Sequence, residues 1–174
     1  MSAPALSAEK MLEWNEKTSR KWRALFEQHP HALALHCDVM GTNDVAGLVH
    51  HFHMAELRYA QRIAGVPETP LDQVGKDLEA SYGAHDRACA MYREFLADPD
   101  FDWQKPIEFN TMTMGRLRSH RDTVFIHAMM HSIRHYAQLA TLVRQNGIKP
   151  GWPMDYLAMD AELVGPESGL ISPT

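Results

Sequence analysis

Along four long stretches of this chain, apolar residues recur every three or four positions, which is the spacing of one buried face of an α-helix. Each stretch is bounded by residues that commonly begin or end helices, with serine, threonine or aspartate near its start and proline or glycine after its end. Four long amphipathic helices in 174 residues predict an all-α fold, a four-helix bundle that forms a single domain over residues 1–174. The four stretches cover residues 7–29, 41–64, 69–98 and 119–147.

The connection between the third and fourth stretches has no helical period and is long for a compact domain, and such loops often carry function. Its two halves, residues 107–109 and 112–117, are expected to pair as a short hairpin around Asn110-Thr111. After the fourth stretch we expect a short helix from residue 152 to about 164. The tail, residues 165–174, is expected to be mobile or to act as a contact arm.

Charge and composition narrow the range of partners. The net charge is −5 and the isoelectric point about 6.1, so no overall positive field favours nucleic acid or an anionic membrane surface. The N-terminus lacks the pattern of a signal peptide, and no apolar run approaches membrane-spanning length. The two cysteines, Cys37 and Cys89, form no CxxC pair, which fits the reducing cytosol. We therefore expect a cytoplasmic protein with no nucleic-acid or membrane partner.

A row of histidines marks the fourth stretch. His127, His131 and His135 follow one another at intervals of four residues, and Gln138 comes three residues later. Because a helix turns every 3.6 residues, these side chains lie along one face, each step rising roughly 6 Å. Apolar residues share this face, so the imidazoles point at least partly into the protein. Two inward imidazoles one turn apart form half of a metal site.

The second stretch can supply the missing ligand. It contains the segment VHHFH, in which His50 lies nearly opposite the apolar face while His51 and His53 lie on its two flanks, so both flanking residues stay candidates. Imidazole suits Zn²⁺, Ni²⁺, Fe²⁺ or Cu²⁺ and does not suit Mg²⁺ or Ca²⁺. Three histidines leave a coordination position open for water or substrate, as in catalytic zinc sites.

Other roles for these histidines stay open at this point. A histidine on an apolar face is often a hydrogen-bonded core residue, and an H-x-x-x-H pair frequently occurs by chance. Among competing cofactors, a di-iron site needs Glu-x-x-His motifs, which the chain lacks, and two histidines one turn apart cannot bind opposite faces of one haem. The G-x-S-x-G motif of serine hydrolases is absent as well. The remaining prediction is a mononuclear site for a divalent transition metal.

Two segments carry motifs of a known family. The first is LVHHFHMAELRYAQRIAG, in which a histidine, an acidic residue, an aromatic residue and R-x-x-G follow in order at His51, Glu56, Tyr59, Arg62 and Gly65. The second is HAMMHSIRHYAQLATLVRQNGIKPGWPMDYL, which contains His131, His135 and Gln138. With these motifs the chain resembles the DinB-like family, also called the YfiT-like metal-dependent hydrolases, which is unrelated to the DNA polymerase of the same name.

The resemblance implies a four-helix bundle with one divalent transition metal (zinc, nickel or iron) on His51, His131 and His135, which selects His51 over His53. It also implies a small-molecule substrate, hydrolase or thiol S-transferase chemistry with a low-molecular-weight thiol as co-substrate, and a homodimer. Arg134 stands beside the ligands where the family usually has histidine, which puts the substrate in question. The alternative hypothesis is a non-catalytic stress or binding module that only holds the metal.

Further residues are candidates for the surroundings of the metal. His127 fits either a fourth ligand or a hydrogen-bonding support of the ligands, and we favour the support. Three more residues are candidate supports or pocket residues: Gln138, Glu56 and His53. Three arginines before the histidine-rich stretch are candidates for binding an anionic group of a co-substrate: Arg116, Arg118 and Arg121.

Overall fold

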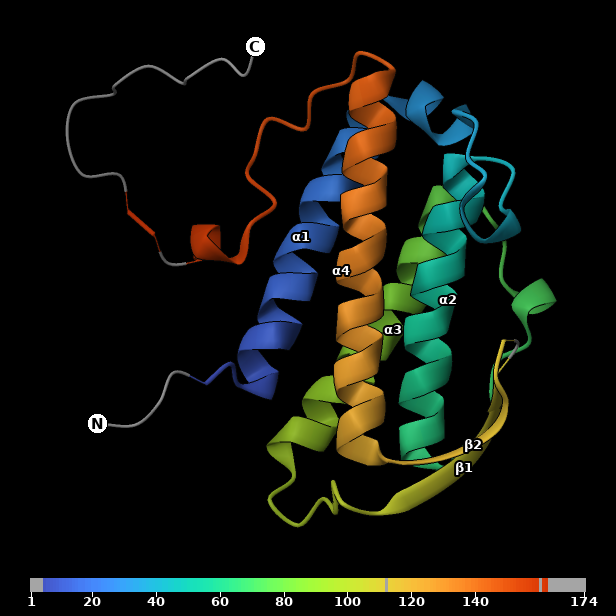
Figure 1. Ribbon diagram of the computed structural model, residues 1–174, viewed down its shortest axis with the longest axis vertical. Coiled ribbons are helices and arrows are strands. Elements are labelled where there is room, and N and C mark those ends of the chain that lie inside the picture. The colour runs from blue at the N-terminus through green and yellow to red at the C-terminus, as the bar shows by residue number, and fades with distance from the viewer. Residues whose placement is uncertain (1–4, 112, 160, 163–174) are drawn as a thin grey trace.

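The computed structural model describes residues 5–111, 113–159 and 161–162. This part of the chain contains four long α-helices that run side by side, and a small two-stranded sheet (Figure 1). The predicted all-α four-helix bundle is confirmed. The helices are α1 (Ala8–Gln28), α2 (Val45–Ala64), α3 (Leu78–Ala97) and α4 (Arg121–Gln145).

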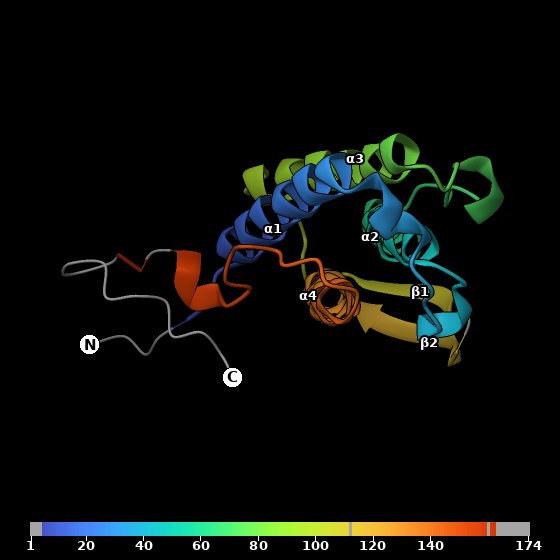
Figure 2. The same cartoon turned by 90° about the horizontal axis from the view of Figure 1, so that it is seen from above.

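The central position in the packing belongs to α2, which contacts both α3 and α4, while α1 contacts the same two helices. Figure 2 looks almost straight along α4, with α2 next to it and the two strands beside both. Two groups of buried apolar side chains fill the interior, one around Trp22, Phe52 and Tyr136 and the other around Tyr92 and Phe125. Burying side chains of this size stabilises the fold by about 1.5–3 kcal/mol each.

The ends of the first two helices follow local sequence signals. The Ser7 side chain accepts a hydrogen bond from the Lys10 amide and caps α1, and Asp44 caps α2 by accepting from the Gly47 amide. Gly65 ends α2 in the left-handed region, at φ 78°, where a residue without Cβ is favoured. These ends agree with the sequence prediction, except that α2 begins at Val45, four residues after the start of the predicted stretch.

The third helix starts later than predicted. It begins at Leu78 with Asp77 as its cap, and only a single 3₁₀ turn, Leu71–Gln73, precedes it. Thr69, the first residue of the predicted stretch 69–98, instead exchanges two hydrogen bonds with the Gln61 side chain of α2, each 2.8 Å long. Thr69 therefore fastens the connection to α2 and does not start a helix.

The predicted hairpin is present as β1 (Pro106–Thr111) and β2 (Gly115–His120), which pair antiparallel from Pro106 opposite His120 to Thr111 opposite Gly115. The predicted turn at Asn110-Thr111 is wrong, because both residues lie within β1 and the chain turns between Thr111 and Gly115. Ser119, the first residue of the predicted stretch 119–147, belongs to β2, and α4 begins at Arg121 directly after the strand.

After α4 the chain returns across α1 and forms a short 3₁₀ helix, Tyr156–Met159 (Figure 1). Two edge-to-face ring contacts hold this return, Trp22 with Trp152 at 5.5 Å and Trp14 with Tyr156 at 5.3 Å between centroids. Within the described residues, the expected short helix is present as a single 3₁₀ turn. Residues 160, 163 and 164 and the tail at residues 165–174 lie outside the described residues. In the part of the chain that the structure describes, none of the helices has the length and apolar character needed to cross a bilayer.

Candidate functional site

Three histidines meet between α2 and α4. His51 comes from the middle of α2, and His131 and His135 come from successive turns of α4. One nitrogen of each imidazole lies within 4.8 Å of the corresponding nitrogens of the other two. The Nε2 atoms of His131 and His135 are 3.2 Å apart. The four-residue spacing on α4 and the packing of α2 against it therefore bring three ligand atoms to one point.

Hydrogen bonding orients His135 for this role. Its Nδ1 lies 2.7 Å from the Oε1 atom of Gln138, and an amide oxygen can only accept, so the ring proton is assigned to Nδ1. The Nε2 lone pair is then free to face His131. The Nε2 atom of His51 and the Nδ1 atom of His131 are buried without a hydrogen-bond partner among the described residues. A group of imidazoles with unpaired buried nitrogens is suited to a metal ion.

The surroundings keep these imidazoles uncharged. Burial, together with the nearby His135 and His51, lowers the pKa of His131 to about 3. Burial is also the main cause that lowers the pKa of His135 to about 4, against the opposing hydrogen bond to Gln138. Burial also lowers the pKa of His51, with the positive charge of Arg134 acting in the same direction. Near neutral pH all three rings therefore carry the free lone pairs that a metal requires.

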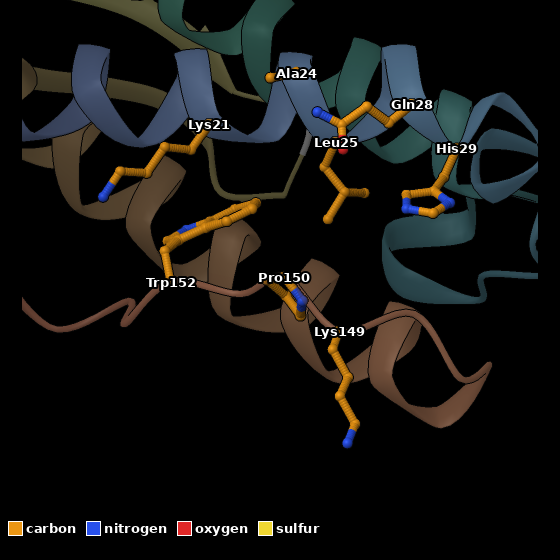
Figure 3. Close-up of a pocket in the computed structure, with 8 residues that line it drawn as sticks. All are labelled: Lys21, Ala24, Leu25, Gln28, His29, Lys149, Pro150 and Trp152. Carbon is orange, nitrogen blue, oxygen red and sulfur yellow. The ribbon is translucent and has the colours of Figure 1, made fainter. Parts of the chain in front are cut away.

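A hollow lies beside this group. It has a volume of about 460 Å³ and is lined by Val39, Arg134, Ala137, Gln138, Thr141 and Leu142. Gln138 connects the hollow to the histidines, because the same side chain accepts from His135. A second cavity, of about 280 Å³, lies between α1 and the returning C-terminal segment, where Trp152 faces Lys21 and Leu25 (Figure 3). The second cavity contains none of the clustered histidines.

Almost the whole sequence is similar to a known protein family. The model described as the DinB family matches residues 1–167, which include both helices that carry the three histidines. The chain belongs to the DinB family. This membership confirms the resemblance drawn from the motifs of α2 and α4. No curated protein matches the chain.

In this DinB protein, other residues of the α2 motif fasten the hairpin. The guanidinium of Arg62 stacks on Tyr59 at 4.9 Å and on Phe109 of β1 at 4.8 Å. It also pairs with Glu68 at 2.8 Å and donates a hydrogen bond to the Asn110 carbonyl at 3.1 Å. The motif thus contributes one residue to the histidine group and two to the attachment of the hairpin.

His127 lies one turn before the group and is more exposed than its members. Its ring centroid is 5.8 Å from that of His131 and 5.1 Å from that of Tyr59. It does not belong to the set of three converging ligand atoms. His127 therefore lies next to the three histidines, on the side that faces the hairpin.

Glu56, expected near the metal, lies instead at the centre of a second buried group. Its Oε1 atom accepts hydrogen bonds from Asn15 of α1 at 2.8 Å and Ser132 of α4 at 2.5 Å, and its Oε2 atom lies 2.6 Å from Nδ1 of His85 on α3. Burial alone would raise the pKa of Glu56, but the contact with His85 outweighs it and lowers the pKa. Conversely, burial opposes protonation of His85, whereas Glu56 raises its pKa.

His53 also turns away from the first group and joins the second. It is fully buried, and its ring lies 4.6 Å from Tyr82 and 4.9 Å from His85 of α3, measured between centroids. The structure therefore brings His51 together with His131 and His135, while His53 faces α3. A helical wheel could not separate the two, because the choice depends on which helix packs against each flank of α2.

The candidate arginines make their contacts elsewhere. Arg116 pairs with Glu108 across the hairpin, Arg118 is exposed on β2, and Arg121 stacks on Phe101 at 4.5 Å. Arg121 precedes His131 by ten residues, or roughly 15 Å along the helix. The positively charged side chain that acts on the three histidines is Arg134. In the sequence, Arg134 stands out only as a departure from the family motif.

Proposed function

We propose that this DinB protein is a metal-dependent enzyme that holds one divalent transition metal (zinc, nickel or iron) on His51, His131 and His135. The bound ion would supply a Lewis acid that lowers the pKa of a thiol or water molecule at its open coordination position. The observation that carries the proposal is the convergence of three uncharged imidazole nitrogens within 4.8 Å. Two nitrogens bound to one tetrahedral zinc ion are about 3.4 Å apart, close to the 3.2 Å between His131 and His135.

The surrounding residues have separate tasks in this proposal. Gln138 keeps the proton of His135 on Nδ1 and so keeps Nε2 available as a ligand. Arg134 lines the neighbouring hollow, where its guanidinium can bind a carboxylate of a small-molecule substrate or of a low-molecular-weight thiol. The hollow would hold such a molecule against Gln138, whose side chain also contacts His135. We therefore propose thiol S-transfer or hydrolysis of an anionic substrate.

The test starts from protein stripped by a chelator and reloaded with Zn²⁺, Ni²⁺ or Fe²⁺. Glutathione, bacillithiol and mycothiol are each screened against a panel of electrophiles, and ester and amide hydrolysis is screened in parallel. We expect activity only in reloaded protein, and its loss in His51→Ala and His131→Ala. His29→Ala, a change at a histidine remote from the group, serves as the matched control.

Two results would contradict the proposal. One is equal activity in stripped and reloaded protein, which would remove the metal from the reaction. The other is an unchanged number of bound metal ions per chain in His51→Ala/His131→Ala, compared with the unmodified protein. Metal binding without any activity, together with collapse of the fold on chelation, would favour the non-catalytic metal-holding module.

We also propose that two copies of the chain pair in the cytoplasm. Ile126 and Met130 lie one turn apart on α4 with exposed fractions of 48% and 55%, which leaves apolar surface for a partner helix. Light scattering at micromolar concentration should give the mass of a dimer, and Met130→Lys should shift it toward the monomer. A monomer of the unmodified chain under these conditions would contradict the pairing.

A further inference from the structure

We propose that the chain holds a second divalent cation inside the bundle, on His53, Glu56 and His85. This site is distinct from the group around His51 and does not depend on the function proposed above. It lies between α2 and α3, whereas the first group lies between α2 and α4. The expectation of a single ion per chain counted the first group alone.

The geometry is that of a ligand set. One ligand atom from each of the three residues lies within 4.8 Å of the other two, and all three side chains are buried. His53 and Glu56 are three residues apart on α2, so they project from the same face toward α3. Two imidazoles and one carboxylate from two facing helices resemble the ligand types of zinc and iron sites in helical bundles.

His53 provides an independent reason to expect a ligand. Its exposed fraction is 0%, yet neither Nδ1 nor Nε2 meets a hydrogen-bond partner among the described residues. The Ser81 backbone lies near the ring and raises its pKa, but it makes no hydrogen bond of good geometry with either nitrogen. Buried polar atoms in native proteins nearly always have a partner, and an ion bound to one of these nitrogens would supply it.

Glu56 is held as ligating carboxylates usually are. Two donors, Asn15 Nδ2 and Ser132 Oγ, occupy its Oε1 atom at 2.8 and 2.5 Å. Its Oε2 atom contacts only His85 among the hydrogen bonds described. Hydrogen bonds to the outer oxygen fix the carboxylate while the inner oxygen stays available to a cation.

The cation would take the place of a proton. Without an ion, a proton bridges His85 Nδ1 and Glu56 Oε2 across 2.6 Å. Ligand atoms at 2.0–2.2 Å from a tetrahedral ion are about 3.4 Å apart, so the two side chains must separate by less than 1 Å. On binding, the bridging proton leaves to solvent, and the ion joins Nδ1 of His85, Oε2 of Glu56 and one nitrogen of His53. The three ligands are buried, so the site suits an ion that ties α2 to α3, with its fourth coordination position left to a small ligand such as water.

The test measures zinc stoichiometry in the full chain. Chelated protein is loaded with excess Zn²⁺, both by long incubation and by refolding with the ion because the site is buried, and unbound metal is removed before elemental analysis. We expect two equivalents in the unmodified chain. His131→Ala/His135→Ala should keep one equivalent, and so should His85→Asn. His29→Ala/His31→Ala, which removes two neighbouring surface histidines, should keep both.

The His131→Ala/His135→Ala variant decides the question, because it leaves His53, Glu56 and His85 unchanged and can be measured even if His85→Asn fails to fold. Its chelated form should melt at a lower temperature than its zinc-loaded form. One equivalent in the unmodified chain that is lost in His131→Ala/His135→Ala would overturn the second site and leave the first intact. One equivalent retained in both proteins would support the second site and overturn the first.

Discussion

Glu56 joins all four helices, so replacing it tests whether the buried network stabilises the fold. Glu56→Gln keeps the shape of the side chain but removes its charge and one acceptor. Asn15 and Ser132 can still donate to the remaining amide oxygen, whereas His85 loses the carboxylate 2.6 Å from its Nδ1. The exposed fractions of His85 and Glu56 are 4% and 1%, so water cannot replace the lost partner.

The expected loss is large for a single substitution. Breaking a buried pair by removing one partner costs about 3–5 kcal/mol. Domains are typically stable by about 5–15 kcal/mol, so Glu56→Gln should remove a substantial fraction of the free energy of unfolding. In Glu56→Gln the pKa of His85 should also fall, because burial lowers this pKa and Glu56, the main group that raises it, is no longer charged.

The assay is urea unfolding followed by far-ultraviolet circular dichroism at neutral pH with a chelator present, so that no ion contributes. The matched control is Glu68→Gln, whose carboxylate pairs with Arg58 and Arg62 but is 28% exposed. Solvent-exposed pairs are worth about 0–1 kcal/mol, so this partly exposed carboxylate should lose less on substitution than the buried Glu56. If Glu56→Gln costs no more than Glu68→Gln, the argument that the central carboxylate holds the helices together is refuted.

Four further outcomes are expected. Circular dichroism of chelated protein should remain that of a folded helical bundle, with any activity returning on addition of Zn²⁺ or Ni²⁺. Gln138→Ala should weaken zinc binding at the first group about 10–100-fold in a competition titration, because His135 loses its orienting acceptor. Arg134→Ala should raise the KM for an anionic substrate while zinc content stays constant. Denaturation of chelated protein should show the free energy of unfolding falling as the pH drops from 6.5 toward about 3. The pKa of both His53 and His131 lies near 3 in the folded protein, so over this range only the unfolded chain binds a proton at these two residues. Each histidine therefore lowers the free energy of unfolding by up to about 1.4 kcal/mol per pH unit.

Local signals made the ends of α1 and α2 predictable. Ser7, Asp44 and Gly65 act on backbone groups within four residues, so their effect depends little on the rest of the fold. Thr69 and Ser119 carry similar signals, but Gln61 of α2 and the partner strand β1 bind them first. Tertiary partners of this kind are invisible in a single stretch of sequence.

The site shows the same division. The spacing of His131 and His135 on one helix made their proximity predictable, and the family motif pointed to His51 as the third member. The group of His53, Glu56 and His85 could not be predicted in this way. Two of its members lie on α2 and one on α3, and the sequence does not show that these two faces pack together. The signals present in the sequence were His53 and Glu56 three residues apart, and His85 on the apolar seam of the third stretch.

The return of the chain across α1 determines what the intrinsic fluorescence of this protein reports. Of its four tryptophans, Trp14, Trp22 and Trp152 lie at or beside the contact between α1 and the returning segment. Trp103 instead packs against Phe125 and Phe101 beside the start of α4. Emission will therefore follow detachment of the C-terminal segment more closely than melting of α2 and α4 around the histidines. An emission midpoint at lower urea than the dichroism midpoint would measure how much more weakly that segment is held than the bundle beneath it.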